Sequence, residues 1–160
     1  MVQIMFFEPL IPGNTGNAIR LAAVTGAHLH LIEPLGFGFE DAHLRRAGLD
    51  YHDLAVTTRH ASFEAAMDAL PGARVFAFTG RAQTPHVEVD YRDSDILLFG
   101  REDVGLPDWV LGHPRITDAV RIPMLEGRRS LNLANSASIA VYEAWRQLGF
   151  EGAAVDGTPA

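Results

Sequence analysis

The sequence contains no cysteine and no lysine. Without cysteine, the chain forms no disulfides, binds no metal through thiolates and has no cysteine nucleophile. Without lysine, it cannot form a P-loop, whose Gly-Lys-Ser or Gly-Lys-Thr motif requires that side chain. No apolar run approaches the roughly 20 residues that a membrane-spanning helix needs, and the first residues do not resemble a secretion signal. We therefore expect a cytoplasmic protein with no membrane partner.

The chain has 160 residues, of which 48% are hydrophobic, and a formal net charge of −7. This length suits one compact domain, which we place at residues 1–152, followed by a flexible tail at 153–160. The negative charge argues against a protein that coats nucleic acid nonspecifically, because phosphate neutralisation supplies most of that affinity. All basic residues are arginines, which suit a local RNA-binding face. The seven histidines follow no metal-ligand spacing such as His-Glu-x-x-His, so we expect no metal.

Short apolar runs alternate with amphipathic segments along the whole chain. This alternation is typical of an α/β fold, with a mostly parallel sheet covered by helices on both faces. The expected strands are Val2–Phe7, His28–Ile32, Leu54–Thr57, Val75–Thr79, Ile96–Phe99 and Val120–Ile122. The expected helices are Thr15–Thr25, Asp41–Ala47, Ser62–Leu70, Asp108–Gly112 and Leu133–Leu148.

The stretch PGNTGNAIRL at residues 12–21 looks like a nucleotide-binding loop, because it joins an expected strand to an expected helix. The dinucleotide fingerprint Gly-x-Gly-x-x-Gly is not present, since two residues separate Gly13 from Gly16. Glu33 nevertheless stands near the place of a ribose-binding acid. A Rossmann-type NAD enzyme therefore stays open as an alternative.

The same stretch predicts the start of a helix. Asn14 or Thr15 can cap it, and the N–H groups of the first turn attract an anion. Arg20 lies one turn further along, close enough to act together with these groups. An anion site and a plain capped helix fit these residues equally well.

The expected last helix carries two apolar stripes. The stripe that packs on the sheet is formed at helical spacing by Leu133, Ala137, Ala140, Val141, Ala144 and Leu148. A second stripe of Ile139, Tyr142 and Trp145 needs another partner. This stripe predicts a homodimer, although a neighbouring loop of the same chain would also cover a large aromatic side chain.

Three loops in the second half of the chain form an ordered set: LLFGREDVGLP at 97–107, VRIPMLEGRRS at 120–130 and SLNLANSAS at 130–138. Together with NTGNAIRL and LRRAGLDYH, they make the chain resemble the SPOUT superfamily of RNA 2′-O-ribose methyltransferases. Within it, the chain is similar to the small single-domain enzymes of the TrmL group, which act on the tRNA wobble position. The resemblance extends from about residue 1 to residue 152.

The resemblance implies S-adenosylmethionine as cofactor, a homodimer and a trefoil knot formed by the C-terminal chain. Carried over by position, the cofactor site falls on Phe78, Gly100, Ile122, Ser130 and Leu131. These positions lie at or after strand ends, where open α/β sheets bind ligands. S-adenosylmethionine carries no phosphate and needs an apolar slot for its adenine, and Gly100 would let the chain pass close to it.

The implied activity is 2′-O-methylation of the tRNA wobble nucleotide, cytidine or carboxymethylaminomethyl-modified uridine, with leucine tRNAs as expected substrates. The implied catalytic residues are Arg20, Ser130 and Asn132. Because a guanidinium stays protonated, we expect Arg20 to hold the adjacent phosphate and stabilise the developing alkoxide. The glycine stretch then faces RNA rather than a cofactor. Further candidates for contacts with RNA or with the second subunit are Asn14, Arg45, Arg46, Arg128, Arg129, Asn135 and Tyr142.

Other functions stay open beside this one. They are 2′-O-methylation at another tRNA or rRNA site, the NAD enzyme named above, and a non-catalytic RNA-binding module with a degenerate site. Binding of S-adenosylmethionine rather than NAD would distinguish a methyltransferase from the NAD enzyme. Methyl transfer to tRNA separates an enzyme from a module.

Overall fold

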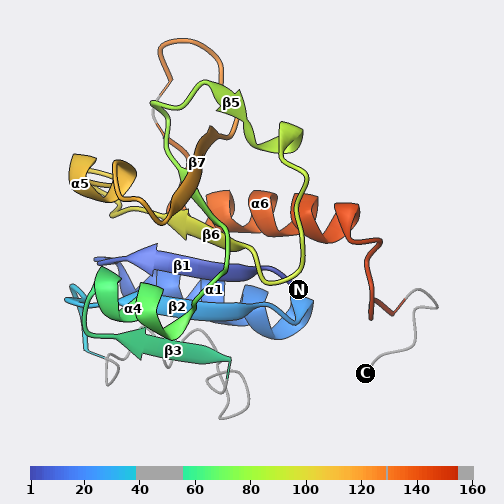
Figure 1. Ribbon diagram of the computed structural model, residues 1–160, viewed down its shortest axis with the longest axis horizontal. Coiled ribbons are helices and arrows are strands. Elements are labelled where there is room, and N and C mark those ends of the chain that lie inside the picture. Colours follow the sequence, from blue (N-terminus) through green and yellow to red (C-terminus); the bar gives the residue numbers. More distant parts are fainter. Residues whose placement is uncertain (39–55, 129, 155–160) are drawn as a thin grey trace.

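The computed structural model describes residues 1–38, 56–128 and 130–154 (Figure 1). In chain order its elements are β1 Gln3–Phe7, α1 Pro12–Thr25, β2 His28–Ile32, β3 Thr57–His60, α4 Phe63–Ala69, β4 Val75–Phe78, β5 Thr84–Pro85, the 3-10 helix η1 His86–Glu88, β6 Ile96–Phe99, α5 Asp108–Leu111, β7 Ile116–Arg121 and α6 Leu133–Gln147. The expected helix Asp41–Ala47 and residues 155–160 of the expected tail lie outside the described residues.

The strands form one seven-stranded sheet in the order β3-β2-β1-β6-β4-β7-β5, and every neighbouring pair is parallel. The α/β prediction is therefore confirmed. The chain builds β1, β2 and β3 outward in one direction and then crosses to β4 on the other side of β1. Strand β6 is inserted between β1 and β4, so the strand order reverses there. Ligands of open α/β sheets bind at such a reversal, beyond the carboxyl ends of the strands.

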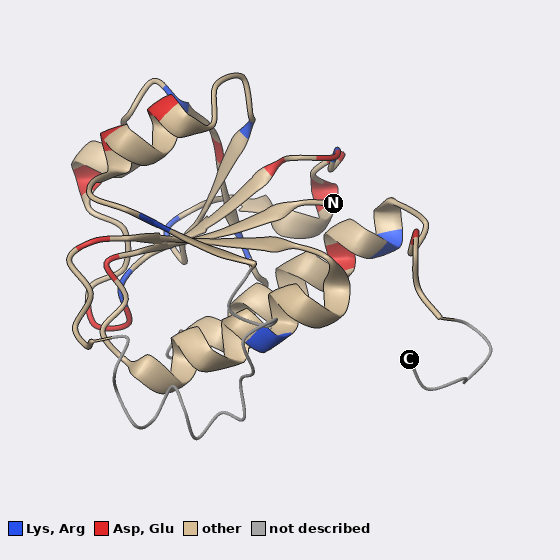
Figure 2. Ribbon diagram, turned by 90° about the horizontal axis from the view of Figure 1, so that it is seen from below, with Lys and Arg blue, Asp and Glu red and all other residues tan. Residues whose placement is uncertain are grey.

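Side chains of each central strand alternate between two cores, one on each face of the sheet. In β1, Ile4 and Phe6 point toward α1 and α6, whereas Met5 and Phe7 point toward α4 and α5. Figure 2 shows the sheet between these two layers of helices. The face of α6 that packs on the sheet consists largely of fully buried small residues: Ala137, Ala140, Val141 and Ala144. The predicted sheet-facing stripe of the last helix is thus confirmed.

Strands β2 and β6 have the predicted bounds, and β1 and β4 differ from prediction by a single end residue. Strand β3 begins where the prediction ended it, at Thr57, and β7 begins earlier than predicted, at Ile116. Neither strand is an uninterrupted run of apolar residues, since β3 reads TTRH and β7 reads ITDAVR, so their bounds are hard to predict from hydrophobicity. The short strand β5 was not predicted. It has two residues, one of them a proline, at the sheet edge, where a missing N–H is tolerated.

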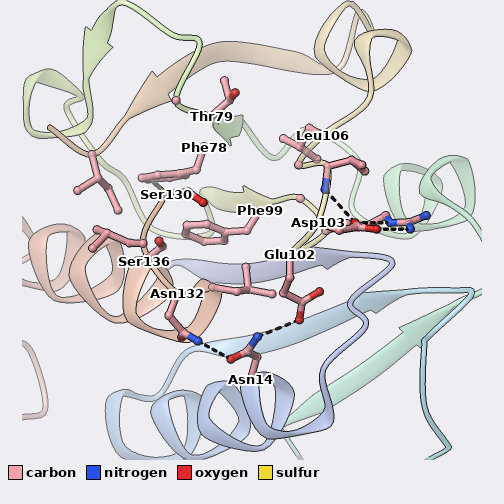
Figure 3. A pocket seen from close by; sticks show the side chains of 18 of the residues that line it. Asn14, Phe78, Thr79, Phe99, Glu102, Asp103, Leu106, Ser130, Asn132 and Ser136 are labelled. Carbon is pink, nitrogen blue, oxygen red and sulfur yellow. Dashed lines mark hydrogen bonds and ion pairs between the residues drawn. The ribbon is translucent and has the colours of Figure 1, made fainter. Parts of the chain in front are cut away.

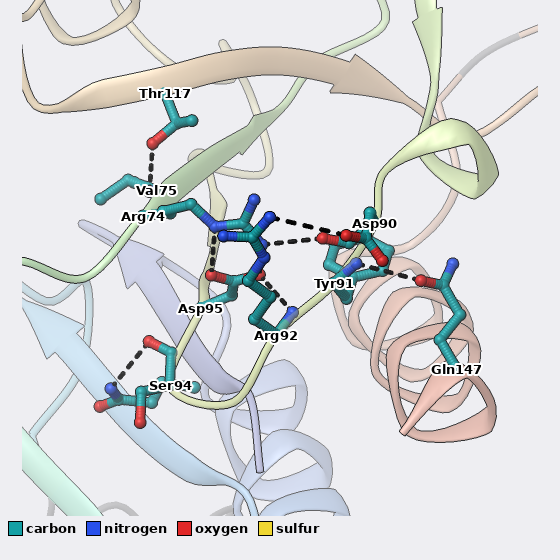
Figure 4. Close-up of polar contacts among 10 residues, drawn as sticks. Arg74, Val75, Asp90, Tyr91, Arg92, Ser94, Asp95, Thr117 and Gln147 are labelled. Atoms are coloured by element: carbon teal, nitrogen blue, oxygen red, sulfur yellow. Dashed lines mark hydrogen bonds and ion pairs between the residues drawn. The ribbon is translucent and has the colours of Figure 1, made fainter. Parts of the chain in front are cut away.

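At the amino ends of β4 and β6, a buried ion pair fixes the two strands to each other (Figure 4). The Arg74 guanidinium donates to both carboxylate oxygens of Asp95, at 2.9 and 2.6 Å, and to the carbonyl of Asp90. The carboxylate of Asp95 also accepts the backbone N–H of Arg92. This bidentate pair closes the end of the sheet opposite to the one where ligands of this fold class bind.

Three histidines meet on the α4 side of the sheet, along β2 and β3: His28 begins β2, His30 lies at its centre and His60 ends β3. His30 Nε2 lies 2.7 Å from Gln3 Oε1 and therefore donates, which leaves His30 Nδ1 to accept from His60 Nε2 at 2.9 Å. The His28 ring lies 4.8 Å from the His30 ring. Burial, followed by the charges of His28 and His60, lowers the pKa of His30 from 6.5 to about 3.

This cluster is not arranged around a metal. Within residues 1–38, 56–128 and 130–154, no group of three or more His, Asp or Glu side chains has a geometry suited to a metal ion. In the same part of the chain, no helix combines the length and the hydrophobicity that crossing a bilayer requires.

The lowered pKa of His30 predicts a loss of stability in acid. Between about pH 6.5 and pH 3 the unfolded chain binds a proton at His30 that the folded chain does not, so stability falls as pH falls through this range. From pH 7.5 to pH 5, this difference corresponds to roughly 1 to 2 kcal/mol. We expect His30→Gln, which can still bond to Gln3 and His60, to reduce this pH dependence. Urea unfolding at both pH values measures it, and an unchanged pH dependence in the variant contradicts the assignment.

Candidate active site

A cavity of about 560 Å³ opens beyond the carboxyl ends of β4, β6 and β7 (Figure 3). Residues 78–81 and 99–106 form two of its walls. Residues from the 122–136 segment and the start of α1 form the remainder. The volume falls within the roughly 300–1,000 Å³ typical of small-molecule sites. The cavity therefore lies at the carboxyl ends of the strands, where ligands bind in this class of fold.

The cavity contains the whole predicted cofactor set. Phe78, Gly100, Ile122, Ser130 and Leu131 all line it. They come from three separate segments of the chain and are brought together only by the strand order. Two further predicted residues, Asn14 and Asn132, line the cavity as well.

Two stacked phenylalanines form an apolar wall of the cavity. Phe78 ends β4 and Phe99 ends β6, and the parallel register places them directly opposite each other. Their ring centroids are 4.6 Å apart with an interplanar angle of 24°. Both side chains are almost fully buried, at 9% and 3% exposure. A flat, apolar wall of this kind suits an aromatic ring system in a ligand.

Gly100 is required by the loop that follows β6. A Cβ atom at residue 100 would lie 2.2 Å from the carbonyl carbon of Gly105 and 2.3 Å from the nitrogen of Leu106. The loop folds back this closely because Arg101 and Gly105 exchange two backbone hydrogen bonds, at 3.3 and 3.0 Å. Gly100 was predicted to let the chain pass close to a ligand, and this stays a prediction. The structure adds a second reason for glycine, since a Cβ atom would collide with the chain's own loop.

The carboxylate of Glu102 lies at the start of helix α1. It accepts the backbone N–H groups of Leu10 and Ile11, at 2.8 and 3.1 Å, and the side-chain amide of Asn14 at 3.0 Å. The helix begins at Pro12 and has no side-chain cap at Ile11. The predicted caps were therefore wrong. Asn14 lies inside the helix, and an anion from a distant loop takes the place expected for an outside anion.

The hydrogen bonds continue from Asn14 to the start of α6 (Figure 3). Asn132 Nδ2 donates to Asn14 Oδ1 at 2.9 Å, and Asn132 Oδ1 accepts the N–H of Asn135, which caps α6. One relay thus joins Glu102, α1 and α6 across the cavity. Both ends of the Asn14 amide are used within the chain, which favours a positioning role over direct contact with RNA.

Other predicted site residues lie away from this cavity. Arg20 is exposed on α1 and does not line it, and neither do Asn135 and Tyr142. Tyr142 is 47% exposed on α6. Arg128 is exposed in the segment before α6. The candidates Arg45, Arg46 and Arg129 lie outside the described residues.

The rim of the cavity carries residues that the sequence analysis did not single out. Arg101 donates to the Asp103 carboxylate at 3.1 and 2.9 Å and lies 3.5 Å from Glu8. The hydrogen bonds from Arg101 hold the pKa of the Asp103 carboxyl below its usual range. Arg81 pairs with Asp108 at 2.6 Å. The acidic pair after Gly100 was the only signal in the sequence for this rim.

Comparison with known proteins assigns this fold and cavity to a family. The model of the SpoU rRNA Methylase family matches residues 1–142. The chain belongs to this family. Proteins similar to this chain include enzymes named for tRNA and for rRNA, so the family name alone does not define the RNA substrate.

One relative is the tRNA (cytidine(34)-2'-O)-methyltransferase of Escherichia coli K12, with 50% identity over 96% of this chain and 98% of its own length. A solved structure concerning the 2-OH methylation of C/U34 on tRNA is 47% identical in sequence and superposes with a TM-score of 0.87. The match covers 93% of this chain and 97% of that chain. The AdoMet-bound rRNA methyltransferase from Sinorhizobium meliloti is 27% identical, with a TM-score of 0.79, covering 92% of this chain and 56% of that one.

The relay predicts a large cost for removing the Glu102 carboxylate. In Glu102→Ala, two backbone N–H groups and the Asn14 amide lose a charged acceptor. We expect the free energy of unfolding to fall by roughly 2 kcal/mol, since part of the lost hydrogen bonding is replaced by water. Urea unfolding measures the change. Glu126→Ala, at an exposed position in the segment before α6, serves as control and should change stability by less than about 0.5 kcal/mol. Equal effects of the two substitutions would show that the relay does not stabilise the fold.

Proposed function

We propose that this SpoU methylase transfers a methyl group from S-adenosylmethionine to the 2′-hydroxyl of nucleotide 34, the wobble nucleotide of tRNA. The observation that carries the proposal is the 50% identity, over almost the full length of both chains, to an enzyme named for this reaction. The cavity supports it, because the complete predicted cofactor set lines one space at the ligand-binding edge of the sheet.

The residues of the cavity fit this cofactor. The Phe78–Phe99 wall suits the adenine, and Ile122, Ser130 and Leu131 line the same space, where their backbone groups would bond to its edge. No phosphate cradle is needed, which agrees with the start of α1 being filled by Glu102. When bound, S-adenosylmethionine supplies a methyl group on a positively charged sulfur, and this sulfur leaves as a neutral thioether.

The chain's own residues have two tasks in this reaction. Methyl transfer is an in-line displacement in which an O–C bond forms as a C–S bond breaks, so alignment of donor and acceptor supplies much of the rate. Asn14, Asn132 and Ser130 support this alignment, the first two by fixing the loop that carries the third. The proton of the 2′-hydroxyl passes to water. Arg20, which stays protonated, stabilises the negative charge that develops on the 2′-oxygen.

Because Arg20 and Tyr142 do not line the cavity, we propose that a second copy of the chain completes the site. Ile139 and Tyr142 form an exposed apolar strip on α6, at 41% and 47% exposure. Trp145, the third member of the predicted stripe, is explained within one chain, since it packs on Phe150 and donates to the carbonyl of Glu151. Light scattering of the purified protein tests the homodimer, and a monomer at micromolar concentration contradicts it.

Arg45, Arg46, Arg128 and Arg129 remain the proposed phosphate contacts, and the leucine tRNAs remain the proposed substrates. An NAD enzyme is disfavoured by a specific observation. The place of a pyrophosphate at the start of α1 is taken by the carboxylate of Glu102, and like charges there repel.

Methylation of unmodified tRNA with labelled S-adenosylmethionine tests the proposed function, with mass spectrometry of nuclease fragments to locate the label and of nucleosides to identify it. We expect label only in a 2′-O-methylated nucleoside, at position 34. Label at another position would reassign the substrate. Absence of label with every tRNA, in spite of S-adenosylmethionine binding, would favour a non-catalytic module.

The same assay tests the role of Arg20. In Arg20→Ala we expect turnover to fall about 100-fold or more, because the developing negative charge loses its stabilising cation. The affinity for S-adenosylmethionine, measured by calorimetry, should stay within about twofold, since Arg20 lies outside the cavity lining. Arg92→Ala, at the opposite edge of the sheet, is the control and should leave both quantities unchanged. Loss of cofactor affinity in Arg20→Ala would show that the two sites are not separate.

A further inference from the structure

Among the residues that the structure describes, four charged side chains line the cavity, and three of them hold the loop after β6 in place. They are Arg81, Arg101, Glu102 and Asp103. Glu102 holds the start of α1, and the Arg101 guanidinium is shared between Asp103 and Glu8. Arg81 differs, because its partner Asp108 does not belong to the cavity lining.

Two contacts fix the guanidinium of Arg81 at the cavity wall. It donates to the carbonyl of Leu106 at 3.1 Å and to the Asp108 carboxylate at 2.6 Å. Leu106 is 3% exposed and lines the cavity, so the first contact anchors the guanidinium to a rigid part of the wall. Figure 3 shows Leu106 on the opposite side of the cavity from Asn132.

The second contact is easily exchanged. The side chains of Arg81 and Asp108 are 60% and 88% exposed, and ion pairs this exposed contribute little to stability. A carboxylate arriving within the cavity could take the place of Asp108 without breaking the bond to Leu106. A guanidinium with one edge anchored and another edge available matches the fork geometry with which arginine binds carboxylates.

We propose that Arg81 binds the carboxylate of the amino-acid end of S-adenosylmethionine, which replaces Asp108 as its partner. This inference rests on the proposed function for the presence of that cofactor. It assigns to Arg81 a role that the predicted cofactor set does not include. That set supplies apolar side chains, a glycine and one hydroxyl, and none of its members carries the positive charge that complements a carboxylate.

The test compares S-adenosylmethionine with its decarboxylated form, which keeps the adenosine, the sulfonium and the amino group. Calorimetry of the full chain measures both affinities. In Arg81→Gln we expect the affinity for S-adenosylmethionine to fall about tenfold or more, because a charge-assisted hydrogen bond is lost. The affinity for the decarboxylated form should change by less than about twofold. Asp108→Asn should bind S-adenosylmethionine as well as or better than the unaltered chain, since a competing carboxylate is removed.

Arg92→Gln is a matched control. Arg92 is also exposed, at 67%, and pairs with an exposed aspartate, Asp90, but it lies at the opposite edge of the sheet. It should leave both affinities unchanged. An equal loss for both ligands in Arg81→Gln, or a loss in Asp108→Asn, would show that the Arg81–Asp108 pair only shapes the wall, and the inference would be wrong. If the unaltered chain binds neither ligand, the proposed function fails instead.

Discussion

The carboxylate of Glu102 is the contact on which the site depends. It lies in the loop after β6, yet it accepts N–H groups at the start of α1, and through Asn14 it reaches the start of α6. Helices α1 and α6 also pack against each other in the core on one face of the sheet. Because a negative charge at a helix start is favourable, the loop is held in one position by electrostatics as well as by geometry. The collision that forbids a side chain at residue 100 imposes the same loop position from the other side.

An acidic chain can hold an RNA substrate when its carboxylates are already used. Asp95 pairs with Arg74 at the amino ends of the strands. At the carboxyl ends, Glu102 accepts the N–H groups of Leu10 and Ile11 just before α1. Arg101 and Asp103 neutralise each other at the rim. Among the described residues, the charged side chains that line the cavity are two arginines and two carboxylates, so their local sum is zero although the whole chain carries −7. Local pairing, rather than the sum over the chain, decides where an anion binds.

The fold was largely predictable, because buried parallel strands such as Ile96–Phe99 consist of uninterrupted apolar residues. The candidate cofactor residues come from the resemblance and stay a prediction, although Phe78 and Gly100 do line one cavity. The helix start was not predictable, because its capping anion comes from a residue 88 positions further along the chain than Asn14. Local rules for caps consider only nearby residues. Arg81 was missed for a similar reason, since only the folded loops bring it to the cavity wall.

The stacked wall of Phe78 and Phe99 is made by strand pairing, and not by the loops around it. In a parallel sheet, a shift of one residue turns every side chain of a strand to the opposite face. A single-residue deletion within β4 would thus send Phe78 into the α4 core and open the wall. An insertion in the connection that carries β5 would leave the pairing intact. Sequence change in this protein is therefore tolerated unevenly: connections away from the cavity can vary in length, whereas the central strands and the loop after β6 must keep their residue count.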